Sequence, residues 1–354
     1  MTEETIEMTT EFFYDESTVQ CDQTGIHLFG KVYVPILYSL VFIIGLFGNL
    51  LVVFTIVKGG HRKSITDIFL LNLATSDLLF VISLPFWGYY IVRGWTLGNL
   101  SCRIVSSFYS IGFFGGMFFI TVISIDRYLA IVHATIFMKG RTARHGFLTS
   151  LVVWVLAILC AAPHFAYVQK LENTCAPRYP PNLVNTWPVF CNLEINIIGF
   201  LLPMVIMSIC YLRIIKTLFT CKNHRKRRAM RLILRVVLVF FLFWTPHQVS
   251  IFLQTLKFFN IFESCNVLRF LYYIMHATET LAFSHCCLNP IIYAFAGEKF
   301  RKYLCHLVLK SLSFVCFCGP CSHYHDRAPT SLTDIVPTSN HTQNTSDQDG
   351  SVLL

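Results

Sequence analysis

Long apolar segments alternate with short polar ones along most of the chain. A helical run of about 20 apolar residues crosses a hydrocarbon core about 30 Å thick, and the sequence contains seven such runs. The pattern predicts an all-α membrane protein, a seven-transmembrane helix bundle with a short amphipathic eighth helix. The predicted spans are residues 32–57, 67–92, 103–133, 147–168, 190–219, 230–257 and 268–295.

The composition argues against a soluble protein. Hydrophobic residues make up 55% of the chain and charged residues only 13%, whereas about one quarter of a soluble domain is charged. The runs lack the internal repeats of transporters, and the histidines are scattered without a metal-binding helix motif. We therefore predict no enzyme activity, no cofactor, no metal site and no nucleic-acid partner.

Charge placement predicts the orientation in the membrane. Residues 1–30 contain seven acidic residues and no Lys or Arg, so the first apolar run is not a cleavable signal peptide. Basic residues instead follow the first, third, fifth and seventh runs, and such loops face the cytoplasm. This predicts a multi-pass protein with its N-terminus outside the cell and its C-terminus in the cytoplasm. The basic loops can meet anionic membrane lipid, and the dense cluster at 222–231 also suits a cytoplasmic partner.

The same pattern divides the chain into four parts. Residues 1–30 form an extracellular acidic tail, and residues 31–296 form the bundle. Residues 297–310 are expected to form a juxtamembrane amphipathic helix. Residues 311–354 are rich in Ser and Thr with little to bury, so we expect a disordered cytoplasmic tail.

Four cysteines fall on the outer side, where disulfides form: Cys21, Cys102, Cys175 and Cys265. They allow three pairings, and the sequence alone does not choose among them. Our working hypothesis is Cys102 with Cys175 and Cys21 with Cys265. These two bridges would hold open a mouth on the outer face.

Polar residues inside the predicted spans need an explanation, because burying them in lipid is costly. Asn49, Asp77, Glu279 and Asn289 are the conspicuous cases. Such groups can simply tie helices together. Because they are spread over three spans, mostly beside helix breakers or small residues, we favour a polar interior that can change its arrangement.

Each span also carries a recognisable signature. The signatures are Gly48-Asn49, Asn72-Leu73-Ala74-Thr75-Ser76-Asp77, Asp126-Arg127-Tyr128, Trp154, Pro203 with Tyr211, Phe243-Trp244-Thr245-Pro246 and Asn289-Pro290-Ile291-Ile292-Tyr293. In this order the set resembles the rhodopsin-type G-protein-coupled receptors.

That resemblance implies an activation switch at the inner end of the third span. Arg127 would pair with Asp126 at rest and turn toward a G protein when the sixth span swings out. Tyr211 and Tyr293 would stabilise the opened form. The full set of implied switch residues is Asp77, Asp126, Arg127, Tyr128, Tyr211, Trp244, Pro246, Asn289, Pro290 and Tyr293.

The stretches "DRYLAIVHA" and Ser83-Leu84-Pro85-Phe86-Trp87 resemble the chemokine-receptor branch of this family. The resemblance implies a ligand pocket that includes the acid Glu279 and three aromatic residues, Tyr38, Trp87 and Tyr109. Tyr14 lies among acidic residues that favour sulfation. The acidic tail and Glu279 together suit a cationic protein ligand. One departure from the branch is His247, where its members usually carry tyrosine.

The resemblance therefore implies a plasma-membrane chemokine receptor for a fractalkine-type chemokine. It would signal through an inhibitory-class heterotrimeric G protein to calcium mobilisation, chemotaxis and cell adhesion. Receptor kinases and arrestin would act on the C-terminal tail. The alternatives are a receptor for a CC-type chemokine and a scavenging or viral chemokine-binding receptor.

Overall fold

The computed structural model describes residues 24–58, 64–133, 142–184, 186–220, 224–259, 261–262, 264–288 and 290. All of them belong to one compact unit, Met1–Cys318. A second unit, Gly319–Leu354, lies outside the described residues, as does the predicted juxtamembrane helix at 297–310. Those parts of the predicted domain organisation stay predictions.

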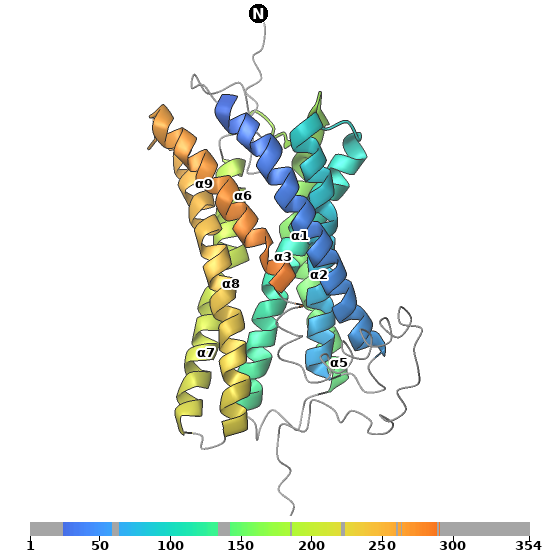
Figure 1. Ribbon diagram of the computed structural model, residues 1–354, viewed down its shortest axis with the longest axis vertical. Helices are drawn as coiled ribbons and strands as arrows, with labels where there is room; N and C mark the ends of the chain where they lie inside the picture. The colour runs from blue at the N-terminus through green and yellow to red at the C-terminus, as the bar shows by residue number, and fades with distance from the viewer. Residues whose placement is uncertain are drawn as a thin grey trace, which may run out of the picture. The chain divides into compact units, whose positions relative to one another are not determined.

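The helices of the described residues follow the seven predicted spans (Figure 1). The fifth span is one continuous helical stretch, made of two α-helices with a π-helical segment between them. After the last long helix, Ser284 forms a turn and residues 285–288 are again helical. The elements are α1 (Thr24–Lys58), α2 (Ile65–Arg93), α3 (Asn99–Val132), α5 (Ala143–Tyr167), α6 (Trp187–Glu194), η1 (Ile195–Leu201), α7 (Leu202–Thr220), α8 (His224–Lys257) and α9 (Cys265–Phe283).

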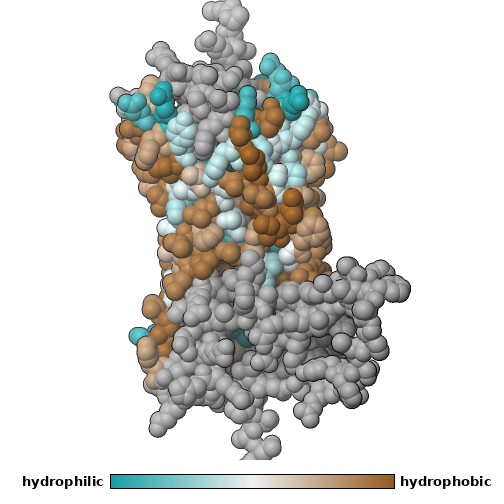
Figure 2. All heavy atoms as spheres, in the orientation of Figure 1, coloured by the Kyte–Doolittle hydropathy of each residue, from teal (hydrophilic) through white to brown (hydrophobic). Residues whose placement is uncertain are grey.

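Five of these helical stretches are long and apolar enough to cross a membrane, namely α1, α2, α3, α5 and the α6–α7 stretch. On α8 and α9, polar side chains turn inward: His247, Gln248 and Glu279 are all buried. Large apolar side chains such as Phe47 and Leu151 point outward. Figure 2 shows such side chains over much of the visible face, with hydrophilic ones gathered toward one end. An apolar outer face with polar groups turned inward is the arrangement that lipid requires.

Local sequence explains where some helices begin and where one deviates. Ser64 caps α2 with a reciprocal pair of hydrogen bonds, because its hydroxyl accepts from the Asp67 amide while the Asp67 carboxylate accepts from the Ser64 amide. Within the fifth span, Pro203 has no amide hydrogen to donate to the carbonyl of Gly199. The π-helical segment η1 lies directly before this proline, which accommodates the missing bond.

A short hairpin covers one end of α3. Strands β1 (Val168–Leu171) and β2 (Thr174–Pro177) pair antiparallel, with Lys170 opposite Cys175. A disulfide joins Cys175 to Cys102 in the first turn of α3, which is the pairing we predicted. Cys265 is also disulfide-bonded, and its predicted partner Cys21 lies outside the described residues.

Helices α2 and α3 approach most closely at Gly112. A β-carbon added there would lie 2.7 Å from the Phe80 amide nitrogen and 2.8 Å from the Ser76 carbonyl oxygen. Backbone atoms cannot move aside as a flexible side chain can, so only glycine fits. One turn along α3, a β-carbon at Gly116 would meet nothing closer than 3.8 Å, an ordinary contact.

We therefore predict that Gly112→Ala destabilises the bundle by about 1–3 kcal/mol, the usual cost of overpacking. Gly116→Ala is the matched control, since it makes the same chemical change on the same helix without the clash. It should be neutral, or stabilising by up to about 1 kcal/mol through helix propensity. Thermal unfolding of the detergent-purified variants measures both. Equal unfolding temperatures for the two would contradict the close approach.

Candidate functional site

A buried acid holds Arg127 near the C-terminal end of α3. The Arg127 Nη2 donates to Asp126 Oδ2 at 2.8 Å and also to the Thr66 hydroxyl on α2. The same carboxylate oxygen accepts from the Thr66 hydroxyl at 3.3 Å. The Asp126 side chain is 3% exposed and that of Arg127 is 24% exposed. This shielded ion pair, together with the contact to Thr66, holds the guanidinium against α2.

Other predicted switch residues lie nearby on α3 and α7. The hydroxyl of Tyr211 is buried and lies 3.3 Å from that of Ser124, so it bridges the two helices. The Tyr128 hydroxyl lies 3.0 Å from the His133 imidazole at the end of its own helix. Two further predicted residues, Asn289 and Tyr293, lie outside the described residues.

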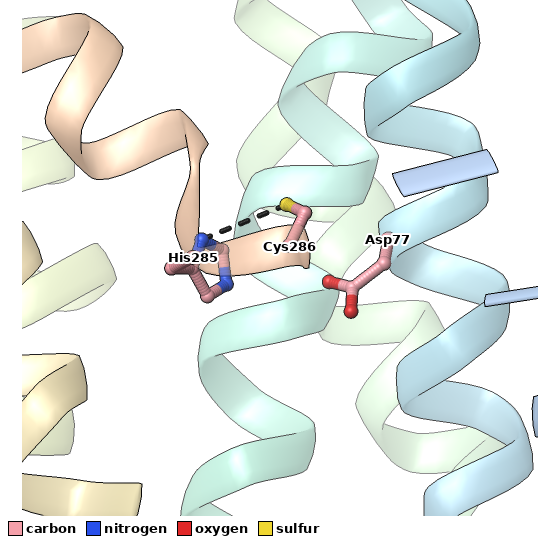
Figure 3. Close-up of side chains that lie close together, drawn as sticks. All are labelled: Asp77, His285 and Cys286. Carbon is pink, nitrogen blue, oxygen red and sulfur yellow. Dashed lines mark hydrogen bonds between the residues drawn. The ribbon is translucent and has the colours of Figure 1, made fainter. Parts of the chain in front are cut away.

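In the middle of the bundle, Asp77 of α2 meets two side chains that follow α9. His285, Cys286 and Asp77 bring their donor atoms within 4.8 Å of one another (Figure 3). His285 Nδ1 lies 3.6 Å from Cys286 Sγ and 3.0 Å from the Ala282 carbonyl oxygen, while the Cys286 thiol hydrogen-bonds to Asp77. These donor types also suit a metal of borderline softness, and they come from both α2 and the residues that follow α9. The cluster therefore links α2 to the end of α9.

Trp244 of α8 connects this cluster to α3. Its ring is 1% exposed and its centroid lies 5.0 Å from that of His285 and 5.2 Å from that of Phe113. It also packs within 6.3 Å of His247, the next turn of α8. A rotation of Trp244 would therefore disturb α3 and α9 together.

Phe283, at the end of α9, is the centre of a second ring cluster. Its side chain is fully buried, and its centroid lies 4.8 Å from that of Phe80, 5.6 Å from that of Tyr38 and 5.7 Å from that of Tyr109. His247 also packs against it, at 6.2 Å. Two of the three predicted ligand-binding aromatics, Tyr38 and Tyr109, thus share one apolar partner.

The third predicted aromatic, Trp87, lies in a different cluster. It packs against Trp95 at 5.6 Å and Tyr90 at 6.1 Å, and all three rings are buried. The structure thus divides the predicted aromatic pocket into two groups of rings, one around Phe283 and one around Trp87.

Glu279 is the acid of the predicted ligand site. Its carboxyl side chain is 5% exposed, and its Oε2 lies 3.4 Å from Nδ1 of His276, one turn earlier on α9. His247 of α8 is close enough to interact electrostatically with both. The sequence analysis singled out Glu279 and His247 but gave no role to His276.

Several signature residues serve as ties between helices. Asn49 Nδ2 donates to the Cys286 carbonyl at 3.1 Å, and Gly48 packs directly against Pro290. Asn72 donates to Ser150 and accepts from the Trp154 indole, at 3.2 and 2.8 Å. The carbonyl of Pro246 accepts from Ser250, whose hydroxyl also lies 3.1 Å from that of Thr278 on α9. For Asn49 and Asn72, interhelical bonding is thus the role that the structure supports.

Comparisons with known proteins agree with these observations. A family model described as "7 transmembrane receptor (rhodopsin family)" matches residues 48–293. CX3C chemokine receptor 1 of Bos taurus is 54% identical, over 98% of both chains, and that of Homo sapiens is 53% identical, also over 98% of both. C-C chemokine receptor type 4 of Homo sapiens is 45% identical, over 96% of this chain and 93% of its own. These relatives are receptors, which confirms the prediction that the chain is not an enzyme.

The ring cluster around Phe283 gives a testable prediction. Phe283→Ala should destabilise the protein by about 3–5 kcal/mol, because a fully buried phenyl ring leaves a cavity. Phe270→Ala is the control on the same helix, since Phe270 is 62% exposed and faces outward. The loss of stability in Phe270→Ala should be much smaller, because lipid replaces the contacts that the ring made. Thermal unfolding of both purified variants measures the difference, and similar losses would contradict the central place of Phe283.

Proposed function

Because the chain belongs to the chemokine receptors of the rhodopsin family of seven-transmembrane receptors, we propose that it binds a chemokine of the CX3C, or fractalkine, type. Binding would be transmitted to a heterotrimeric G protein of the inhibitory class. The outputs would be calcium mobilisation, chemotaxis and cell adhesion. Its place would be the plasma membrane, with the N-terminus extracellular and the C-terminus cytoplasmic.

The ion pair between Arg127 and Asp126 is the observation that most supports a signalling receptor. A buried carboxylate and a hydroxyl from α2 hold the guanidinium at one end of the bundle. Removing that restraint would free a cation where a cytoplasmic protein can dock. An intact Asp126-Arg127-Tyr128 triplet also argues against a scavenger that binds without signalling.

At the opposite end, the charge pattern suits a basic protein ligand. Residues 1–30 carry seven acidic residues and no Lys or Arg, and Glu279 supplies an acid inside the bundle. Opposite charges attract such a ligand and orient it during its approach. Tyr14, which lies outside the described residues, would strengthen this attraction if it carried a sulfate.

The cytoplasmic side would bring the remaining partners. Basic loops would meet anionic lipid, and the Ser- and Thr-rich residues 311–354 would accept phosphates from receptor kinases. The added negative charge would then recruit arrestin. The inner cluster of switch residues, with Tyr211, Trp244 and Pro246, would change its packing when the G protein binds.

A second candidate ligand is a C-C chemokine. The 45% identity to C-C chemokine receptor type 4 of Homo sapiens favours this alternative. Higher identity to the two CX3C receptors, over an equal or larger share of the chain, favours the CX3C type.

Ligand binding distinguishes the two. Cells displaying the chain should bind a labelled CX3C chemokine and raise intracellular calcium, while C-C chemokines compete weakly. Glu279→Gln should keep surface expression, because the amide preserves the shape, but should lower agonist potency by about tenfold or more as a charge-assisted contact is lost. Preferential binding of C-C chemokines would favour the alternative, and silence to every chemokine tested would remove the proposed function.

Signalling should depend on Arg127 more than binding does. Arg127→Ala removes the group proposed to meet the G protein, so the calcium response should fall below detection while ligand affinity changes less than about tenfold, within the usual range of allosteric coupling. Lys216→Ala is a control that removes another exposed cation, on α7, and should leave signalling intact. Equal signalling by the parent and Arg127→Ala would contradict the switch.

A further inference from the structure

A histidine on α9 already contacts the acid that the proposed ligand would bind. His276 Nδ1 lies 3.4 Å from Glu279 Oε2, and the two residues are one helical turn apart. Their side chains are only 9% and 5% exposed. In such a shielded setting a charge–charge contact is screened little by salt. A protonated His276 is therefore an internal counter-ion for Glu279.

A second histidine lies opposite this pair. His247 of α8 is 4% exposed, interacts electrostatically with both Glu279 and His276, and packs between Phe283 and Trp244. Within the described residues, its Nδ1 makes no hydrogen bond. The Glu279 carboxyl group thus has one imidazole near it on its own helix, α9, and another on α8.

We propose that His276 competes with the basic ligand for Glu279 and makes ligand binding depend on external pH. This inference rests on the proposed function and names a residue that tunes the same site. When His276 is neutral, the Glu279 carboxylate is available to a ligand cation. When His276 is protonated, the two side chains form an internal ion pair, and the ligand must displace a proton to reach the acid.

The direction of the effect follows from linkage. Histidine changes its charge between about pH 5 and 8. If binding releases one proton, affinity falls as the pH falls, by at most a factor of ten per pH unit. Acidic tissue would therefore weaken the response, and neutral surroundings would restore it.

Other ionisable groups near the pair must be considered, since α9 packs against α8 and α1. His247 is the one that an electrostatic interaction ties to both members of the pair. Tyrosine, lysine and arginine do not change charge between pH 5.5 and 7.5 in ordinary surroundings. Toward the N-terminal ends of α1 and α9 and at the C-terminal end of α8, the tyrosine, lysine and arginine side chains are Lys31, Tyr33, Tyr38, Lys257, Arg269, Tyr272 and Tyr273.

Equilibrium binding of a labelled CX3C chemokine to membranes bearing the full chain, at pH 5.5 and 7.5, tests the proposal. The parent should bind about tenfold more weakly at pH 5.5, the change expected from one histidine. His276→Gln keeps the size and polarity but cannot be charged, so its affinity should be high and change less than about twofold between the two pH values. His276→Lys supplies a permanent cation and should bind weakly at both.

A simple folding defect is excluded because His276→Gln should bind as tightly as the parent at pH 7.5 and more tightly than the parent at pH 5.5. His145→Gln removes an exposed histidine from the start of α5 and should keep the pH dependence of the parent. An unchanged pH dependence in His276→Gln, or equal affinity of the Gln and Lys variants at pH 7.5, would overturn the proposal. The Glu279→Gln variant tests the proposed ligand site separately from the role of His276. If this variant binds the chemokine as tightly as the parent does, Glu279 is not part of the ligand site.

Discussion

The structure depends on one constraint: a charged group taken among apolar helices must find its partner inside the bundle. Lipid offers no hydrogen bonds, so an unpaired charge there is costly. Asp126 is matched by Arg127 and Thr66, Asp77 by Cys286, and Glu279 by His276. Each of these contacts therefore holds two neighbouring helices, or two successive turns of one helix, in place relative to each other.

Rings connect these three polar pairs. Glu279 is one turn from Phe283, which packs against His247, which in turn packs against Trp244. Trp244 packs against His285 of the Asp77 cluster and against Phe113 on α3, the helix that also carries Asp126 and Arg127. Close-packed side chains transmit displacement because they leave little free volume. In the proposed receptor, a ligand cation that moved Glu279 would act through these contacts on α3, the helix that carries Asp126 and Arg127.

Much of this could be predicted from the sequence, and the rest could not for physical reasons. The helices follow from apolar runs of membrane length, and the pairing of Asp126 with Arg127 follows from their adjacency and the family signature. Phe283 gave no signal, because a phenylalanine in an apolar run looks the same whether it faces lipid or a ring cluster. His276 lies three residues before Glu279, a spacing visible in the sequence, but only the structure reveals that both side chains face inward.

The packing also indicates which helices can move. Among the described residues, α1, α2, α3 and α5 pack extensively in sequence order, and Gly112 brings the backbones of α2 and α3 together. The disulfide at Cys102 adds a covalent tie on that side. In contrast, α8 packs mainly against α9 and only lightly against α7. Pro246 interrupts its hydrogen bonding midway, and a proline in a helix acts as a hinge. A rearrangement therefore costs least where α8 leaves α7 while α1, α2, α3 and α5 keep their places, and Arg127 would change partners only when its bonds to Asp126 and Thr66 break.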